Sequence, residues 1–214
     1  MLAIHLLCNN LEHPIIPHLQ HWIKSNQCRH QVSLISSKEE AKGGDILLLI
    51  SCSDYISSKI TSKYSKIFVI HASDLPKGRG WSPHVWTLLD GAEELTISLI
   101  EAHEKIDQGD IWAQEKIAIA PSDLFDEIDS KLFAAEIRLI EKAVRLIESG
   151  QKVGTRQIGE ASYFPKRTPE DSEIDPSKPL SDTFNKIRLM DVNRYPAFFK
   201  LHDSEFIIEI KKRV

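Results

Sequence analysis

The sequence has few cysteines and no long hydrophobic run. Its three cysteines, Cys8, Cys28 and Cys52, form no C-x-x-C pair and no cluster with histidine. This pattern predicts reduced thiols in a cytosol and no metal site. The longest aliphatic run, Ile46–Ile50, is far shorter than the roughly 20 residues that cross a bilayer. Residues 1–5 lack the cationic start of a secretory signal. We therefore expect a soluble, cytoplasmic protein with no membrane partner.

The chain also lacks an excess of positive charge. Lys and Arg number 27 against 31 Asp and Glu, which gives a formal net charge of −4. Because nucleic-acid binding depends on clustered Lys and Arg, we expect no nucleic-acid partner. Hydrophobic residues make up 42% of the 214 residues, an ordinary globular value. At about 150 residues per domain, this length predicts one large domain, alone or with a small appendage.

Short apolar runs alternate with helical periodicity along the first half of the chain. Such alternation predicts an α/β fold with a Rossmann-like, mostly parallel sheet and helices on both faces. Two later runs predict an antiparallel pair of strands. The expected strands cover 2–7, 31–35, 45–50, 67–70, 95–100 and 111–117, and the first expected helix covers about 13–25.

The clearest predicted helix begins after Pro121-Ser122, where Ser122 is the expected N-cap, and ends at Gly150. Beyond it the sequence becomes rich in proline and polar residues. A turn at Asp203-Ser204 before the apolar run 206–210 predicts a small terminal hairpin. We expect one domain over 1–160 and, over 161–214, a C-terminal extension that ends in this hairpin.

Candidate chemistry concentrates between His71 and Pro83. The segment follows a predicted strand, where ligands bind in open α/β sheets. It offers the titratable imidazole of His71, the hydroxyl of Ser73 and the cations Lys77 and Arg79. Taken alone, His71 is as well explained as a strand-end histidine bonded to the backbone as it is as a functional residue. The two cations can likewise be explained as part of a solvated loop. Asp107, in a turn with glycine, is on its own most simply a turn former.

Three sequence blocks that occur in one order favour a functional role for His71 and Asp107 over these simpler explanations. They are H-x-S-x-L-P-x-x-R-G at 71–80, D-x-G-D-I at 107–111, and Tyr163 to Asp171. Together they resemble the folate-dependent formyltransferase family. The resemblance covers roughly residues 45–175, and the first 44 residues agree only in fold pattern. Three ordered blocks are far more specific than any one of them.

The resemblance implies transfer of a formyl group from 10-formyltetrahydrofolate, a cosubstrate, to a primary amine. Attack of the amine gives a tetrahedral adduct whose oxyanion needs a fixed donor. The matching donor is His71, and Asp107 matches the family's catalytic carboxylate, which takes up the amine's proton. A carboxylate beside an imidazole favours the protonated ring.

One position departs from the family. Its motif has Asn two residues before the histidine as a second oxyanion donor, and here that residue is Val69. Valine cannot donate a hydrogen bond, and loss of such a donor typically costs about 10²- to 10³-fold in rate. Ser73 or a nearby backbone N–H is the expected substitute. A slow or inactive protein is the alternative.

The resemblance also assigns binding residues. Folate would lie against two loops, and the loop after the first strand would hold a phosphate or sugar beside a helix N-terminus. Cys52 is more simply a small buried core residue than a reactive one, and the first loop is equally well a plain strand–helix turn. The folate-binding residues are Ser51, Cys52, Ser53, Asp54, His103, Glu104 and Ile106, and the first-loop residues are Asn9 and Asn10.

Two further segments resemble one branch of the family and so indicate the class of acceptor amine. Residues 75–83 and 194–199 resemble small sugar N-formyltransferases of the pseudaminic-acid type, which act on a UDP-linked 4-amino-4,6-dideoxy sugar. Lys77 and Arg79 would then meet the diphosphate or shape the pocket. Trp81 or a C-terminal aromatic would lie against the sugar or uracil. A homodimer paired through the terminal hairpin is compatible with the sequence.

Other acceptors stay open. The methionyl-tRNA enzymes carry a C-terminal barrel that the residues after Tyr163 cannot build, and the charge of −4 also disfavours tRNA. A purine-pathway amine and an aminoacyl group on a carrier are alternatives. So is a catalytically silent module that binds folate or a nucleotide sugar.

Overall fold

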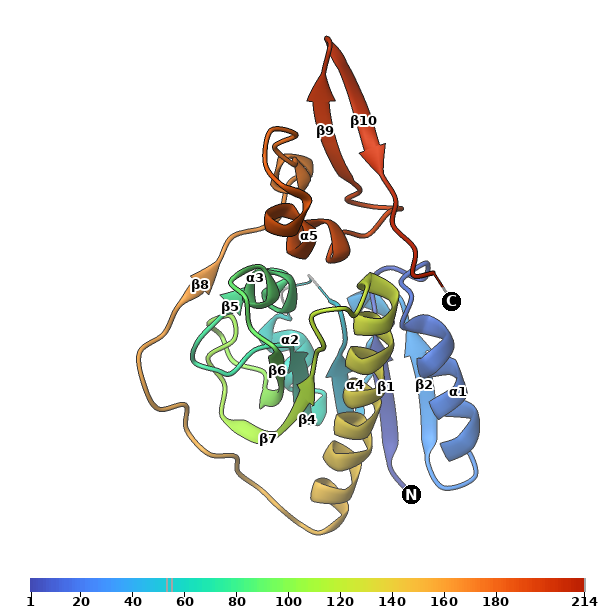
Figure 1. Ribbon diagram of the computed structural model, residues 1–214. Coiled ribbons are helices and arrows are strands. Elements are labelled where there is room, and N and C mark those ends of the chain that lie inside the picture. The colour runs from blue at the N-terminus through green and yellow to red at the C-terminus, as the bar shows by residue number, and fades with distance from the viewer. Residues whose placement is uncertain (53, 55, 214) are drawn as a thin grey trace.

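The computed structural model describes residues 1–52, 54 and 56–213. Among these, the main sheet contains β1 (Ala3–Leu7), β2 (Gln31–Ile35), β3 (Gly44–Leu49), β4 (Tyr64–His71), β6 (Glu94–Glu101) and β7 (Ile111–Ala118). Their order is β2-β1-β3-β4-β6-β7 (Figure 1). The first four pair in parallel, whereas β6 runs antiparallel to β4 and β7 antiparallel to β6. The predicted mostly parallel α/β fold, with its antiparallel pair, is confirmed.

Two long helices, α1 (Ile16–Asn26) and α4 (Phe125–Glu148), cover one face of the sheet (Figure 1). Their apolar sides and alternate residues of the strands form the main core. The other face carries a smaller cluster beside the single turn α2 (Ser58–Thr61). Between β2 and β3 the described chain forms only a short 3-10 turn, η1 (Lys38–Glu40). Helices were expected on both faces of the sheet. Long helices cover only the face of α1 and α4 in the described chain, and the other face carries the single turn α2.

The start of α4 differs from the prediction. The helix begins at Phe125, so Ser122 is not its N-cap. Instead, the Asp123 carboxylate accepts a hydrogen bond from the Ala120 N–H at 2.7 Å, and Glu127 accepts one from the Leu124 N–H at 2.8 Å. Glu127, which also suits the positive end of the helix dipole, thus takes the role expected of the serine, and Asp123 fixes the turn that leads into the helix. At the other end, Gly150 has φ of +81° directly after the helix, as expected for a C-cap glycine.

After α4 the chain runs along the outside of the sheet and returns to the loop beyond β4 (Figure 1). There β8 (Tyr163–Phe164) pairs in parallel with β5 (Arg79–Gly80). Gly80 must be glycine, because its φ is +100° and a Cβ would lie 2.4 Å from the carbonyl oxygen of Phe164. This short pairing ties two distant segments of the sequence together.

The C-terminal residues form η2 (Pro169–Ser172), α5 (Leu180–Arg188) and a hairpin of β9 (Ala197–Leu201) and β10 (Ser204–Ile208). α5 lies over the sheet end at which β1 finishes, close to α3 (Pro83–Leu89), and the hairpin projects away from the body (Figure 1). The hairpin turn is at His202 and Asp203, one residue before its predicted place. The domain boundary at 160 and the homodimer stay predictions. No helix in the described ranges is long and apolar enough to cross a bilayer.

Candidate functional site

The site is built around His71, the last residue of β4. Its side chain is buried, and Nε2 lies 2.9 Å from the carbonyl oxygen of Gly78. Because a carbonyl oxygen only accepts, Nε2 carries a proton in this arrangement. The other ring nitrogen, Nδ1, lies 3.6 Å from Oδ1 of Asp107. A second proton, on Nδ1, would make the ring a cation facing that carboxylate.

Asp107 reaches His71 from the loop between β6 and β7. Its side chain is only 7% exposed, and its Oδ2 accepts a hydrogen bond from the Gly80 N–H at 2.9 Å. Its backbone has φ of +56°, an uncommon conformation for a residue other than glycine. The carboxylate is thus held between an imidazole and a backbone donor. The structure brings together the two residues that the sequence predicted to be catalytic.

Val69 lies on β4, where the family motif would have Asn. It is partly buried and packs against the small cluster on the second face of the sheet, as do Cys52 and Ala102. The surroundings of Val69 on this side are therefore apolar. The pKa of the Cys52 thiol is raised to about 11, and burial is the largest of the several causes. This residue therefore behaves as a packed thiol rather than a thiolate.

Ser73 lies two residues after His71, and its N–H donates to the His71 carbonyl at 3.0 Å. The Ser73 carbonyl accepts a hydrogen bond from the Ser98 hydroxyl at 2.7 Å. Its own Oγ is buried and has no hydrogen-bond partner within the described chain. A buried hydroxyl without a partner is costly, which suits a group that meets a ligand.

The predicted binding loops are brought together only in part. Asn9, after β1, donates through Nδ2 to Oδ2 of Asp54, after β3, at 3.0 Å. Asn10 instead caps a local turn, with Oδ1 accepting from the Glu12 N–H at 3.0 Å. Ser51 is exposed with φ of +47°, and Ser53 lies outside the described residues. His103, Glu104 and Ile106 are exposed in the loop that leads to Asp107.

The predicted cations and Trp81 lie on the loop after His71. Lys77 is exposed. Arg79 is engaged by the protein itself, since its guanidinium donates to Oε1 of Gln157 at 2.6 Å and to the Tyr163 hydroxyl at 3.1 Å. Trp81 is 43% exposed, with the ammonium of Lys166 5.3 Å from its ring centre. Lys77 and Trp81 are thus accessible, whereas Arg79 holds the loop.

A second group of polar side chains, for which the sequence predicted no role, lies where the extension meets the body. The guanidinium carbons of Arg167 and Arg194 lie 4.9 Å and 5.8 Å from the ring centre of Tyr195. Burial lowers the pKa of His84 to about 4, and Arg167, His13 and His71 add to the effect. These residues therefore form a series of cationic and imidazole groups that reaches from His71 to the extension. Their only signal in the sequence is the pair of short motifs at 164–167 and 194–196.

Carboxylates lie beside this series. Burial, and next Asp191, raise the pKa of Asp129 to about 7, whereas Arg194 acts in the opposite direction. Glu136 is buried on α4, its Oε2 has no partner within the described chain, and burial raises its pKa to about 8. These carboxyl groups keep protons over a range in which exposed ones lose them.

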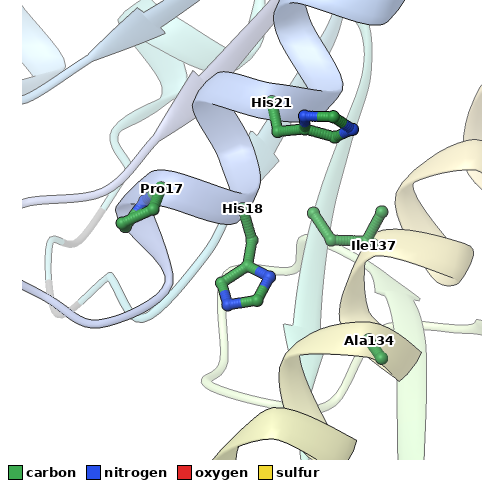
Figure 2. Close-up of a pocket in the computed structure, with 5 residues that line it drawn as sticks. All are labelled: Pro17, His18, His21, Ala134 and Ile137. Atoms are coloured by element: carbon green, nitrogen blue, oxygen red, sulfur yellow. The ribbon is translucent and has the colours of Figure 1, made fainter.

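A shallow, mostly apolar hollow lies between α1 and α4, lined by Pro17, His18, His21, Ala134 and Ile137 (Figure 2). It contains none of the predicted site residues. Within residues 1–52, 54 and 56–213, no group of three or more His, Cys, Asp or Glu side chains is arranged to hold a metal ion.

Comparison with known proteins decides the family. The sequence pattern of the formyl transferase family matches residues 14–144. The chain belongs to the formyl transferase family. It is 32% identical over 151 residues to a methionyl-tRNA formyltransferase of Coprothermobacter proteolyticus, a match that covers 70% of this chain and 50% of that protein. The chain therefore spans about half the length of this relative.

Solved structures of formyl transferases and other proteins share the fold. A methionyl-tRNA formyltransferase from Clostridium thermocellum has a TM-score of 0.78 at 26% identity, over 96% of this chain and 90% of that one. HypX from Aquifex aeolicus, solved with tetrahydrofolic acid, has a TM-score of 0.78 at 20% identity, and the match covers 95% of this chain and 36% of that one. A sugar N-formyltransferase from Shewanella has a TM-score of 0.76 at 14% identity, and the match covers 100% of this chain and 99% of that one. The last two likenesses concern the fold alone.

Proposed function

We propose that the chain transfers a formyl group from 10-formyltetrahydrofolate to the primary amine of a nucleotide-linked amino sugar. The observation that carries this proposal is the pairing of His71 with Asp107 at the carboxyl end of β4, with Nδ1 and Oδ1 3.6 Å apart. Family membership supports the formyl transfer. The fold shared with HypX, which was solved with tetrahydrofolic acid, supports a folate-type donor.

In the proposed reaction the amine nitrogen attacks the formyl carbon and forms a C–N bond. His71, protonated on both ring nitrogens, donates a hydrogen bond to the developing oxyanion from Nδ1, the nitrogen that is not bonded to the Gly78 carbonyl, and Asp107 takes the proton that the amine nitrogen loses. The bond between the formyl carbon and N10 of the folate then breaks, and N10 gains a proton. The products are a formamide and tetrahydrofolate. Both side chains are buried, so their charges act in a region of low dielectric constant.

For the second donor we propose the Oγ of Ser73, which is buried without a partner in the described chain. It replaces the Asn amide that Val69 cannot supply. Folate is proposed to lie against the loops at 51–54 and 103–106, next to the apolar surface around Val69 and Cys52.

The acceptor is proposed to lie along the series from His71 to the extension. Arg194 is exposed and Arg167 is buried, and both face the ring of Tyr195. Guanidinium groups suit a diphosphate because they donate several hydrogen bonds from a fixed charge. We propose Lys77 and Trp81, both accessible, as further contacts to the nucleotide sugar, and Asn9 and Asn10 as contacts near the helix α1.

A panel of acceptors tests the proposal. The protein is mixed with 10-formyltetrahydrofolate and, separately, UDP- and dTDP-linked 4-amino sugars, a purine-pathway amine and methionyl-tRNA, the substrate named for the C. proteolyticus relative. Mass spectrometry then reports any acceptor that gains one formyl group. We expect a 4-amino sugar to gain it. Formylation of methionyl-tRNA alone would replace the sugar, and folate binding without any product would indicate a silent binding module.

A further inference from the structure

The amide of Gln157 connects the segments that hold Asp107. Gln157 lies half-buried in the stretch between α4 and β8. Its Nε2 donates hydrogen bonds to the carbonyl oxygens of Asp107 and Gly109, both at 2.8 Å. Its Oε1 accepts one from the Arg79 guanidinium at 2.6 Å. Both donors of the amide are therefore used on the loop that carries the carboxylate, and its acceptor is used on β5.

The loop from Asp107 to Gly109 needs such support. The φ of Asp107 is +56°, a conformation that costs an ordinary residue about 1 kcal/mol or more. Gly109 lies so close to β6 that a Cβ would be 1.6 Å from the carbonyl oxygen of Glu101. Because the backbone of Asp107 fixes where its carboxylate points, a bond to that carbonyl acts on the catalytic geometry.

The same amide also braces the other partner of the carboxylate. Arg79, held by Gln157, directly precedes Gly80, whose N–H donates to Oδ2 of Asp107 at 2.9 Å. The Tyr163 hydroxyl accepts hydrogen bonds from Arg79 at 3.1 Å and from Gln108 at 3.3 Å. A closed network thus links the Asp107 loop, β5 and β8, with Gln157 in contact with two of the three.

We propose that Gln157 is a positioning residue for formyl transfer. By donating to the Asp107 and Gly109 carbonyls, it holds the Asp107 carboxylate against His71 and the Gly80 N–H. It touches no reacting atom. The effect on rate rests on the proposed function, whereas the effect on the position of Asp107 does not.

Two substitutions separate the donors from the acceptor of the amide. Gln157→Glu keeps the shape and the contact with Arg79 but cannot donate to the carbonyls. Gln157→Leu removes both. Gln151→Leu is the matched control, because Gln151 lies in the same segment and, among the residues that the structure describes, its amide donates only to the Val153 carbonyl, at 3.1 Å. We expect both Gln157 variants to lower kcat by about 10- to 100-fold while KM for the folate donor changes little, and the control to leave both unchanged.

The Gly80 amide gives a readout that needs no turnover. Its hydrogen bond to Asp107 should protect it from exchange and set its NMR chemical shift. We expect the Gln157 variants to move this resonance and speed its exchange by about tenfold or more, in the same direction as Asp107→Ala. Thermal unfolding confirms that each variant is folded.

The outcomes separate the two proposals. If the wild type transfers no formyl group but the Gly80 amide responds as expected, the proposed function fails and the positioning role stands. A folded Gln157→Glu with the wild-type kcat and Gly80 resonance would overturn the positioning role. So would a loss in Gln157→Leu that Gln157→Glu does not share, because the contact with Arg79 would then carry the effect.

Discussion

Oδ1 of Asp107 lies 3.6 Å from Nδ1 of His71, although His71 ends β4 and Asp107 lies in the loop between β6 and β7, far away in the sequence. Each is fixed by a backbone group from the loop between them, His71 by the Gly78 carbonyl and Asp107 by the Gly80 N–H. The loop that contains both glycines therefore sets the distance between the imidazole and the carboxylate.

The first prediction concerns the pair itself. His71→Ala and Asp107→Asn should each lower turnover by about 10³-fold or more, because one removes the oxyanion donor and the other the proton acceptor. Asn at 107 can still accept from the Gly80 N–H, so the fold should be kept. Steady-state kinetics and folate-binding titrations check this, with Asp110→Asn, an exposed position in the same loop, as the control. Retained turnover in either variant would remove these roles.

The second prediction concerns Val69. Val69→Asn places a donor on β4 two residues before His71, but because the Ser73 Oγ is proposed to serve as the second donor already, we expect kcat to change by less than about threefold. The amide would lie among apolar neighbours such as Cys52 and Ala102, so stability should fall by about 1 to 2 kcal/mol. Val69→Ala controls for the change in size. A folded Val69→Asn whose kcat rises by about tenfold or more would mean that the second donor is missing and that Ser73 does not supply it.

The third prediction compares two glycines with similar backbone. Gly80 has φ of +100° and Gly91 has φ of +90°, but a Cβ would meet the Phe164 oxygen at 2.4 Å at Gly80 and nothing within 4 Å at Gly91. Gly91→Ala should cost about 1 kcal/mol from conformation alone. Gly80→Ala should cost at least about 2 kcal/mol more and lower activity, since the donor to Asp107 moves. Chemical denaturation checks both, and equal losses would contradict the close approach.

The fourth prediction follows from Glu136. Burial raises its pKa from 4.5 to about 8 in the folded protein. Between these values the folded state holds a proton that the unfolded state has lost, so this group makes stability fall as pH rises from about 4.5 to about 8. Glu136→Gln should remove this fall and gain about 2 to 4 kcal/mol at pH 8 relative to its effect at pH 4.5. Denaturation at several pH values, with Glu141→Gln on the exposed side of α4, checks this. A wild-type slope that survives in Glu136→Gln would show that Glu136 ionises normally.

Much of the fold could be predicted because local patterns of apolar residues indicate its strands and helices. The apolar runs that became β1, β3 and β4 are buried on a sheet, and the run before His71 already placed that residue at a strand end. Hydrophobic periodicity located α4, but not its first residue, because Glu127 rather than Ser122 accepts a hydrogen bond from the N-cap N–H. Capping depends on which side chain reaches back, and the sequence offers several.

The site was predictable only where motifs exist. His71 and Asp107 fall within recognisable blocks, and the structure places them together. Gln157 could not be found, since two of its three partners are backbone carbonyls, which any residue supplies. Arg167, Arg194 and His84 likewise come together only when the extension packs on the body. Such contacts arise from tertiary packing, and no periodicity or spacing records them.

The most direct measurement follows the formyl carbon. Donor folate carrying a ¹³C-labelled formyl group is incubated with a UDP-linked 4-amino-4,6-dideoxy sugar and the protein, and ¹³C NMR records the label. The account predicts that the signal moves from the folate to a sugar formamide in the wild type and stays on the folate with His71→Ala and with Asp107→Asn. A label that stays on the folate in the wild type, or moves equally well in both variants, would contradict it.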